Sequence, residues 1–124
     1  MGMGVFDSVG TVRPYRIWEG AVARAVHGER ITFAVVDLEP NRVVPGHSHA
    51  NEQVGMVLKG AVTMTIGGES RRLVAGDTYV IPGDVPHGAE TGPEGASVLD
   101  VFTPTREDWE QAERLEPSPG AWPA

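Results

Sequence analysis

Apolar and polar residues alternate over short stretches along most of this chain. Over residues 61–66, for example, Val62, Met64 and Ile66 fall on one face and two threonines fall on the other. A period of two residues is typical of a β-strand with one buried face, because successive side chains of a strand point to opposite sides. Strand-like runs rich in branched and aromatic residues recur over residues 15–20, 21–26, 31–38, 54–58, 71–74, 78–81 and 97–102. The pattern predicts a protein built from about eight short strands.

Turn-forming residues separate these runs. The chain has 16 Gly and 10 Pro among its 124 residues, a composition that favours many strands joined by tight turns. Gly67-Gly68 predicts a two-residue hairpin, Gly60 predicts a turn, and residues 90–95 predict a loop. A chain of this length suits one domain with one core. We therefore expect an all-β, single-domain barrel over residues 15–103, closed so that few strand edges are exposed.

The two ends of the chain depart from the strand pattern. Residues 1–14 contain several glycines and predict a flexible N-terminal arm. After the last strand, Trp109, Ala112 and Leu115 recur at roughly helical spacing, which predicts a short C-terminal helix over residues 104–116. Residues 117–124 carry further prolines and little to pack, and they predict a frayed tail.

Charge and composition narrow the possible partners. The net charge of −7 argues against nucleic acid as a partner and gives no attraction to an anionic membrane. The chain has no cysteine, which excludes disulfides and thiolate metal sites. It begins without the basic region and apolar run of a signal peptide, and no apolar run approaches the length of a membrane span. We therefore expect a cytoplasmic location.

Two histidines lie one residue apart between Pro45 and Gly60. In an extended strand His47 and His49 point to the same side, and two imidazoles on one side can bind a divalent metal. Gln53 has the same parity, so an uninterrupted strand adds its amide to this face and turns Glu52 away, whereas a bulge would make Glu52 the ligand.

A third histidine completes the candidate metal site. It is His87, the last residue of a second turn-rich stretch over residues 76–87. The four residues together predict a single metal ion on His47, His49, Gln53 and His87. Since these ligands are neutral, the full charge of the ion would favour an anionic substrate. The identity of the ion stays open among zinc, nickel, iron, manganese and copper.

Polar and aromatic residues near the last strand are the candidates for chemistry. Asp100 stands in an apolar strand, where an unpaired carboxylate is costly, so it either transfers protons or forms a structural salt bridge with Arg24 or Arg106. Arg106 is either a surface charge or binds a substrate carboxylate with its forked donors. The candidate catalytic residues are thus Asp100 and Arg106. The candidate substrate contacts are Phe102, Arg106 and Met56, although Phe102 and Met56 could instead be core residues.

The spacing of the histidines resembles the paired motifs of the cupin superfamily. In the first motif, two histidines one residue apart precede a carboxylate and then a glycine; here Gln53 stands at the carboxylate and Gly60 at that glycine, while Asn41 replaces an earlier glycine. The second motif is matched by Gly76, Pro82 and His87, with Asp84 in place of a glycine. The resemblance implies a cupin-type double-stranded β-helix, the jelly-roll barrel.

A narrower resemblance involves three segments. They are His-Ser-His-x-x-Glu-Gln, Val-Pro-His-Gly-Ala and Leu-Asp-Val-Phe-x-Pro-x-Arg-Glu-Asp, and they look like the pectin-degradation cupins that linearise unsaturated monouronates. That group holds its metal on three histidines and one glutamine, which matches the four residues named above. The resemblance also implies roles beside the substrate for Asp100, Phe102 and Arg106.

The expected function follows from both lines of reasoning. We expect a metal-dependent enzyme that opens the ring of an unsaturated uronate or a similar small, anionic carbonyl compound. The alternatives are a polyketide cyclase or isomerase, an Fe(II) dioxygenase, and a non-catalytic module that binds a small ligand. Small cupins commonly pair, so the resemblance also implies a homodimer, formed through the N-terminal strands.

Overall fold

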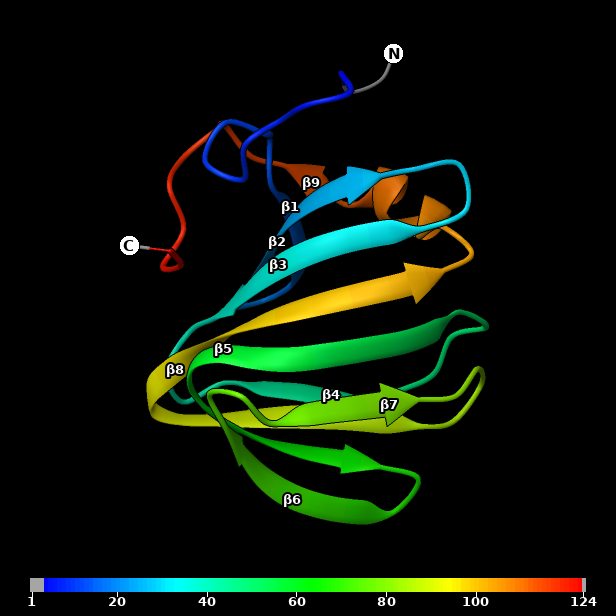
Figure 1. Cartoon of the computed structure of the whole chain (residues 1–124). Helices are drawn as coiled ribbons and strands as arrows, with labels where there is room; N and C mark the ends of the chain where they lie inside the picture. Colours follow the sequence, from blue (N-terminus) through cyan, green and yellow to red (C-terminus); the bar gives the residue numbers. More distant parts are fainter. Residues whose placement is uncertain (1–3, 124) are drawn as a thin grey trace.

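The computed structural model describes residues 4–123, and strands dominate it (Figure 1). A single 3-10 helix, η1 (Glu107–Gln111), is found in this part of the chain. The strands are β1 (Tyr15–Trp18), β2 (Ala21–His27), β3 (Thr32–Leu38), β4 (Val43–His47), β5 (Glu52–Ile66), β6 (Glu69–Val74), β7 (Thr78–Ile81), β8 (His87–Thr103) and β9 (Glu113–Arg114). The expected all-β fold is confirmed.

Two antiparallel layers share the long strands β5 and β8. In one layer, the first part of β5 and the last part of β8 lie between β3 and β7, and β2, β1 and β9 continue the layer beyond β3. In the other layer, the remaining parts of β5 and β8 pair with β6 and β4. This arrangement is the expected jelly-roll barrel, with the core between the layers.

Glycines let the long strands pass from one layer to the other. Gly60 and Gly95 have φ values of 76° and 68°, and a Cβ on Gly60 would lie 2.2 Å from the carbonyl oxygen of Gly95. Only residues without a Cβ can approach so closely in this conformation. The turn expected at Gly60 and the loop expected over residues 90–95 are therefore wrong, because both segments are bends within continuous strands.

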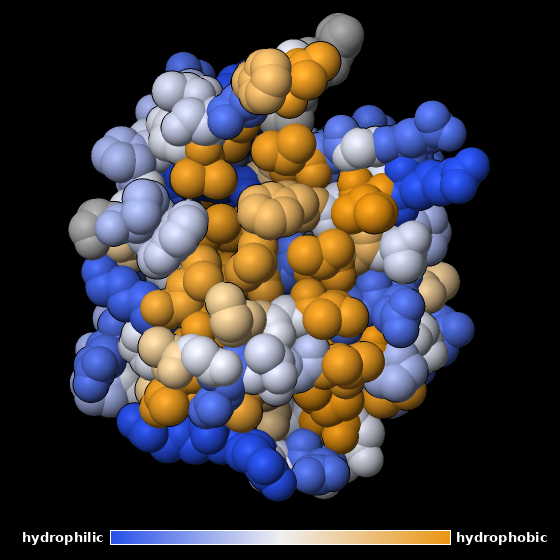
Figure 2. Space-filling view, in the orientation of Figure 1, coloured by the Kyte–Doolittle hydropathy of each residue, from blue (hydrophilic) through white to orange (hydrophobic). Residues whose placement is uncertain are grey.

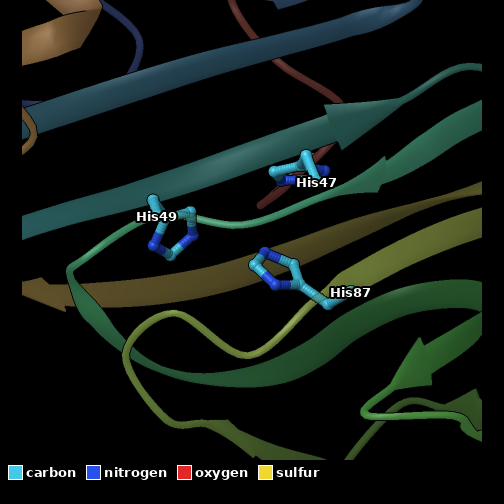
Figure 3. A group of neighbouring side chains, drawn as sticks. All are labelled: His47, His49 and His87. Atoms are coloured by element: carbon cyan, nitrogen blue, oxygen red, sulfur yellow. The ribbon is translucent and has the colours of Figure 1, made fainter.

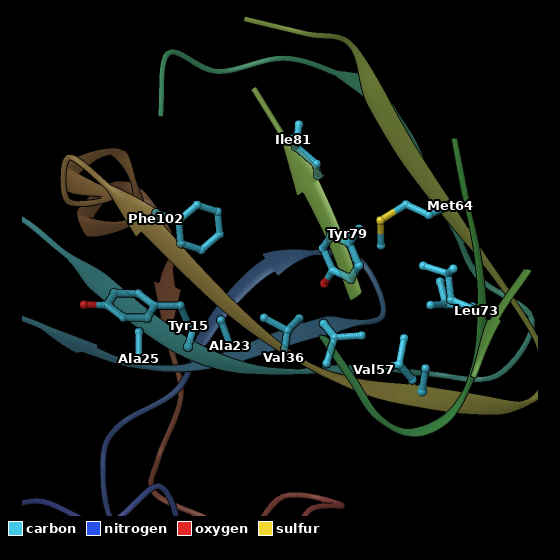
Figure 4. Packing of buried hydrophobic residues seen from close by; sticks show 14 of the residues in the cluster. Tyr15, Ala23, Ala25, Val36, Val57, Met64, Leu73, Tyr79, Ile81 and Phe102 are labelled. Atoms are coloured by element: carbon cyan, nitrogen blue, oxygen red, sulfur yellow. The ribbon is translucent and has the colours of Figure 1, made fainter. Parts of the chain in front are cut away.

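Side chains of different size share the interior. Ala23, Ala25 and Ala34 line the inner side of β2 and β3, and their small volume leaves room for aromatic rings from other elements. Figure 4 shows Val36, Tyr79 and other apolar side chains directed into the space between the layers. The opposite, outer face of the first layer is also apolar in its middle (Figure 2).

The C-terminal helix is shorter than the expected range of 104–116. Only Glu107–Gln111 is helical, and Glu113 and Arg114 instead pair with β1 as strand β9. The apolar spacing was read correctly for Trp109, which is buried, but its side chain packs on Phe102 and Tyr15 from a single 3-10 turn. The described residues contain no helix with the length and hydropathy needed to cross a membrane.

Both terminal segments are fastened to the barrel. In the expected N-terminal arm, Val12 is buried and the carbonyl oxygen of Pro14 accepts a hydrogen bond from Leu115, while residues 1–3 lie outside the described residues. In the expected frayed tail, Ser118 accepts from the Arg24 guanidinium and the Ala121 amide donates to Asp37. Arg24 and Asp37 form an ion pair with each other, and the tail is held in place because it completes the hydrogen bonds of that pair.

Candidate metal centre

Three imidazole rings meet at one end of the barrel (Figure 3). His47 ends β4 and is paired with His87 at the start of β8, while His49 follows in the loop before β5. One ring nitrogen from each of these histidines lies within 4.8 Å of the other two. The β4–β8 pairing thus brings together residues that are 40 positions apart in the numbering.

Backbone carbonyls fix which nitrogen of each ring carries the proton. The Nδ1 atoms of His47, His49 and His87 lie 2.9, 3.0 and 2.9 Å from the carbonyl oxygens of Pro45, Asn51 and Val85. An Nδ1–H group must donate in each bond, so Nε2 is the nitrogen that keeps a free lone pair when the ring is neutral, as in a metal-binding imidazole.

The Nε2 atom of His87 has no polar partner among the described residues although it is buried. A buried nitrogen is rarely left without one, so this atom calls for a ligand. Burial lowers the pKa of His87 and of His49 below the ordinary value for histidine, and the nearby Arg106 adds to the effect at His49. Both rings are therefore neutral at pH 7, which is the form that coordinates a cation.

Gln53 completes the group, with its Oε1 3.1 Å from Nε2 of His49. The amide also makes a side-chain hydrogen bond with Asp100, in which its N–H must donate, so the oxygen faces the histidines. Since Nε2 of His49 is unprotonated, two acceptors then face each other, and a cation between them would relieve the repulsion. The donor set therefore fits a divalent metal.

The route by which Gln53 reaches the site differs from the expected one. The strand does not continue from His47 to Gln53, because residues 48–51 form a loop and β5 begins at Glu52. Alternation within β5 itself then buries Gln53 and leaves Glu52 exposed. This geometry favours Gln53 over Glu52 as the fourth ligand.

Asp100 is buried beside this group, and its partner is a tyrosine. The Tyr79 hydroxyl donates to Oδ1 of Asp100 over 2.6 Å. Burial raises the pKa of Asp100, and the hydrogen bonds from Tyr79 and Gln53 oppose that rise. The alternative of a structural salt bridge with Arg24 or Arg106 is not found in residues 4–123, where Arg24 pairs with Asp37 at 3.0 Å and Arg106 pairs with Asp108 at 2.8 Å.

Sequence reasoning missed Tyr79. Gly55 is paired with Tyr79 on one side and with Asp100 on the other, and a Cβ on Gly55 would lie 2.3 Å from the tyrosine ring. The Tyr79 ring of β7 therefore passes over Gly55 of β5 and reaches Asp100 on β8. A glycine inside a strand often marks such a close approach, and this was the available signal.

Arg106 packs against two aromatic rings that meet edge to face. Its guanidinium carbon lies 4.7 Å from the ring centroid of Phe102 and 4.7 Å from that of Trp109. Asp108 accepts from Nε at 3.0 Å and from Nη2 at 2.8 Å, and these hydrogen bonds lower the pKa of Asp108. Trp109 was expected only to pack a helix, yet here it positions a charged group.

A cavity of about 380 Å³ connects these residues, a size suited to a small molecule. Most of the predicted site residues line it: His47, His49, Gln53, His87, Asp100, Phe102 and Arg106. Met56 does not line it, because Met56 lies on the same face of β5 as the exposed Val54. The structure therefore places Met56 outside the candidate site, and Met64 contributes to the cavity wall instead.

A jelly-roll barrel with a histidine cluster at its open end is a cupin arrangement. The sequence profile of the family described as "Cupin domain" matches residues 34–102, more than half of the chain. The chain belongs to the cupin family. Cupins bind divalent metals, and the histidine cluster is consistent with that property.

Individual relatives are more specific. The chain is 36% identical over 58 residues to the HTH-type transcriptional regulator PuuR of Escherichia coli (strain K12), which covers 46% of this chain and 31% of the regulator. It is 34% identical over 64 residues to the pectin degradation protein KdgF of Dickeya dadantii (strain 3937), which covers 51% of this chain and 58% of that protein. The matches span less than two thirds of either relative.

A solved structure matches over a longer range. KdgF from Halomonas sp. superposes with a TM-score of 0.75 and 30% sequence identity, over 86% of this chain and 98% of that one. This protein is therefore a small cupin similar to the pectin-degradation cupins.

Proposed function

We propose that this protein is a metal-dependent enzyme that opens the ring of a 4,5-unsaturated monouronate to give the linear keto form. The observation that carries the proposal is the convergence of ring nitrogens from three histidines and the Gln53 oxygen beside the buried Asp100. The likeness to two pectin-degradation cupins supports the choice of substrate.

The metal would be held by His47, His49, Gln53 and His87. Zinc, nickel, iron, manganese and copper all suit such nitrogen-rich ligands. When bound, a divalent ion at this position would act as a Lewis acid toward a substrate oxygen. Because its four ligands are neutral, the charge of the ion would favour an anionic substrate.

Asp100 would transfer the proton. The anomeric hydroxyl loses its proton, the bond between the anomeric carbon and the ring oxygen breaks, and the unsaturated carbon next to the hydroxyl-bearing ring position gains a proton. The product has the same atoms as the substrate, so one carboxylate can accept and return the proton. The raised pKa of Asp100 suits this exchange, since a base closer to neutrality is also a usable acid.

Arg106 would orient the carboxylate of the substrate. Asp108 engages its Nε and Nη2, and within residues 4–123 no acceptor bonds to Nη1. The rings of Phe102 and Trp109 meet edge to face and both lie against the guanidinium, which limits its rotation and presents Nη1 in a fixed direction. A second carboxylate can therefore bind to this arginine without displacing Asp108.

The direct test is the loss of ultraviolet absorbance of an unsaturated uronate upon addition of metal-loaded protein. We expect Asp100→Asn to lower kcat by about 10²- to 10⁴-fold, the usual contribution of a general acid or base, with little change in metal content. Asp84→Asn is the matched control, because Asp84 is exposed and asparagine accepts its φ of 66°. No absorbance change with the wild-type protein would exclude this substrate.

A second candidate function is a binding module for a small ligand without turnover. The match to the regulator PuuR favours it, since that relative is a transcriptional regulator. A uronate that binds the metal-loaded protein and is recovered unchanged after long incubation would support this alternative against the enzyme.

A second copy of the chain would cover the outer face of the first layer. Val26, Phe33, Val101, Val54 and Val80 are neighbours in the strand register and form one uncharged row across β2, β3, β8, β5 and β7. Figure 2 shows this apolar face. The row includes β2 and β3 from the N-terminal strands that the resemblance implied, but not β1. Two chains of charge −7 repel least where their surfaces are uncharged, which favours this face for a homodimer.

A further inference from the structure

An irregularity in β1 turns Trp18 toward the inside of the barrel. Tyr15 is paired with Ala23 and Trp18 with Ala21, and the register shifts between them. Opposed residues of an antiparallel pair lie on the same face, and both alanines are buried on the inner side of β2. Tyr15 and Trp18 therefore share the inner face although they are three positions apart, which regular alternation does not allow. The additional residue, Ile17, forms a bulge.

The bulge places the indole at the entrance of the cavity. Trp18 lines the cavity, and its ring centroid is 5.0 Å from that of His47. Its exposed fraction is 36%, whereas Trp109, which lines the same cavity, is only 5% exposed. Trp109 is thus a core residue that also borders the site, while Trp18 keeps part of its ring surface free next to a candidate metal ligand.

We propose that Trp18 is a specificity-determining residue that stacks on the ring of a cyclic substrate bound at the histidine cluster. The inference rests on the proposed function, because it assigns a contact to the same small anionic sugar. It also adds to that function, because it requires the ligand to enter as a closed ring.

The chemistry of the residues that line the cavity supports this role. The histidine cluster and Arg106 offer contacts to oxygen atoms, and neither recognises the carbon framework of a sugar. An indole offers a rigid apolar surface that fits the C–H face of a pyranose or the flat part of an unsaturated ring. Arg16, the neighbouring polar residue of β1, already bonds to Glu113 at 3.1 Å. Ile17 also lines the cavity, but it packs against the core and has no planar surface, so Trp18 is the residue of β1 that offers a flat face to a sugar ring.

Two carboxylates of equal charge test this inference. Galacturonate is predominantly a ring, and gluconate is an open chain at neutral pH, so only the first offers a face for stacking. Binding of each to zinc-loaded protein would be measured by calorimetry and by quenching of tryptophan fluorescence. We expect Trp18→Ala to weaken galacturonate binding about three- to tenfold and to leave gluconate binding within about twofold, whereas Trp18→Phe retains most of the preference.

Trp122→Ala is the matched control, because Trp122 has the same exposed fraction of 36% and lies in the tail outside the cavity lining. Zinc content is measured for every variant, since Trp18 contacts His47, and affinities are compared at equal loading. Equal weakening of both ligands, or unchanged galacturonate binding in Trp18→Ala, would overturn the inference. Wild-type protein that binds neither ligand would overturn the inference alone, because the proposed function is tested separately by the absorbance of the unsaturated uronate. Trp18-dependent binding of galacturonate without conversion of an unsaturated uronate would overturn the proposed reaction alone.

Discussion

At the scale of single residues, the neighbour of Gln53 explains why an amide stands where the cupin motif has a carboxylate. Gln53 bonds to Asp100 and presents its oxygen to His49. A glutamate could do only the second, and it would place a further negative charge against the buried carboxylate of Asp100. The amide therefore lets a candidate ligand and a candidate proton carrier occupy adjacent positions.

His27 gives a pH prediction that is independent of the candidate site. His27 ends β2, where its Nδ1 contacts Thr32 Oγ1 at 2.8 Å and its Nε2 contacts the Tyr15 hydroxyl at 3.2 Å. Burial lowers the pKa of His27; Glu110 opposes this shift and Arg114 adds to it. Below pH 6.5 the unfolded chain thus takes up a proton more readily than the folded chain.

The contribution of His27 to stability should therefore be complete above pH 6.5 and decrease as the pH falls through the lowered pKa. Urea unfolding of the wild type and of His27→Gln, measured from pH 5 to pH 8, would isolate it from the other histidines. The difference between the two free energies of unfolding should increase with pH and then become constant. A difference that is independent of pH would contradict this linkage.

At the scale of elements, three neighbouring strands cooperate to position Asp100. Tyr79 of β7 reaches Asp100 of β8 only because Gly55 of β5, which lies between them, has no side chain. The site therefore requires that β5 has no side chain at position 55, although Gly55 itself takes no part in the chemistry.

Substitution of this glycine should be costly. In Gly55→Ala the new Cβ would meet the Tyr79 ring at 2.3 Å, so the ring must move and its hydrogen bond with Asp100 is lost. We expect a loss of about 1–3 kcal/mol in the free energy of unfolding, the usual cost of overpacking a core. Urea denaturation would measure it, with Gly92→Ala as control, because no atom lies within 4 Å of the corresponding Cβ there. Equal stability of both variants would show that the ring can adapt.

The elements also show what a sequence can predict. The strand pattern and the histidine spacing were sufficient for the barrel and for the group of His47, His49 and His87, because local alternation and ligand chemistry are visible in the chain. Gln53 was placed on the site by an argument that assumed an uninterrupted strand, and the loop before β5 happens to preserve the result. Tyr79 and Trp18 were not foreseen as site residues, since one depends on pairing across three strands and the other on a bulge.

At the scale of the whole molecule, the outer face of the first layer has two different halves. Across one half, the tail covers the Arg24–Asp37 ion pair and donates to it from Ala121, while Ser97 also donates to Asp37. These bonds satisfy polar groups that would otherwise be poorly solvated. The other half, the uncharged row across β2, β3, β8, β5 and β7, receives no such cover from the tail, as Figure 2 illustrates.

This difference leads to a prediction about assembly. Val54 is 45% exposed within the row, between Val101 and Val80, so a lysine there would place two like charges together at a symmetric contact between two copies. We expect the wild type to be a dimer in light scattering after gel filtration, and Val54→Lys to be a monomer with an unchanged circular dichroism spectrum. Val74→Lys should remain dimeric, because Val74 has a similar exposed fraction of 41% but lies on β6, away from the row. A monomeric wild type, or a dimer that tolerates Val54→Lys, would remove this face as the contact. Since the cavity opens elsewhere on the barrel, pairing through this face would leave both candidate sites accessible.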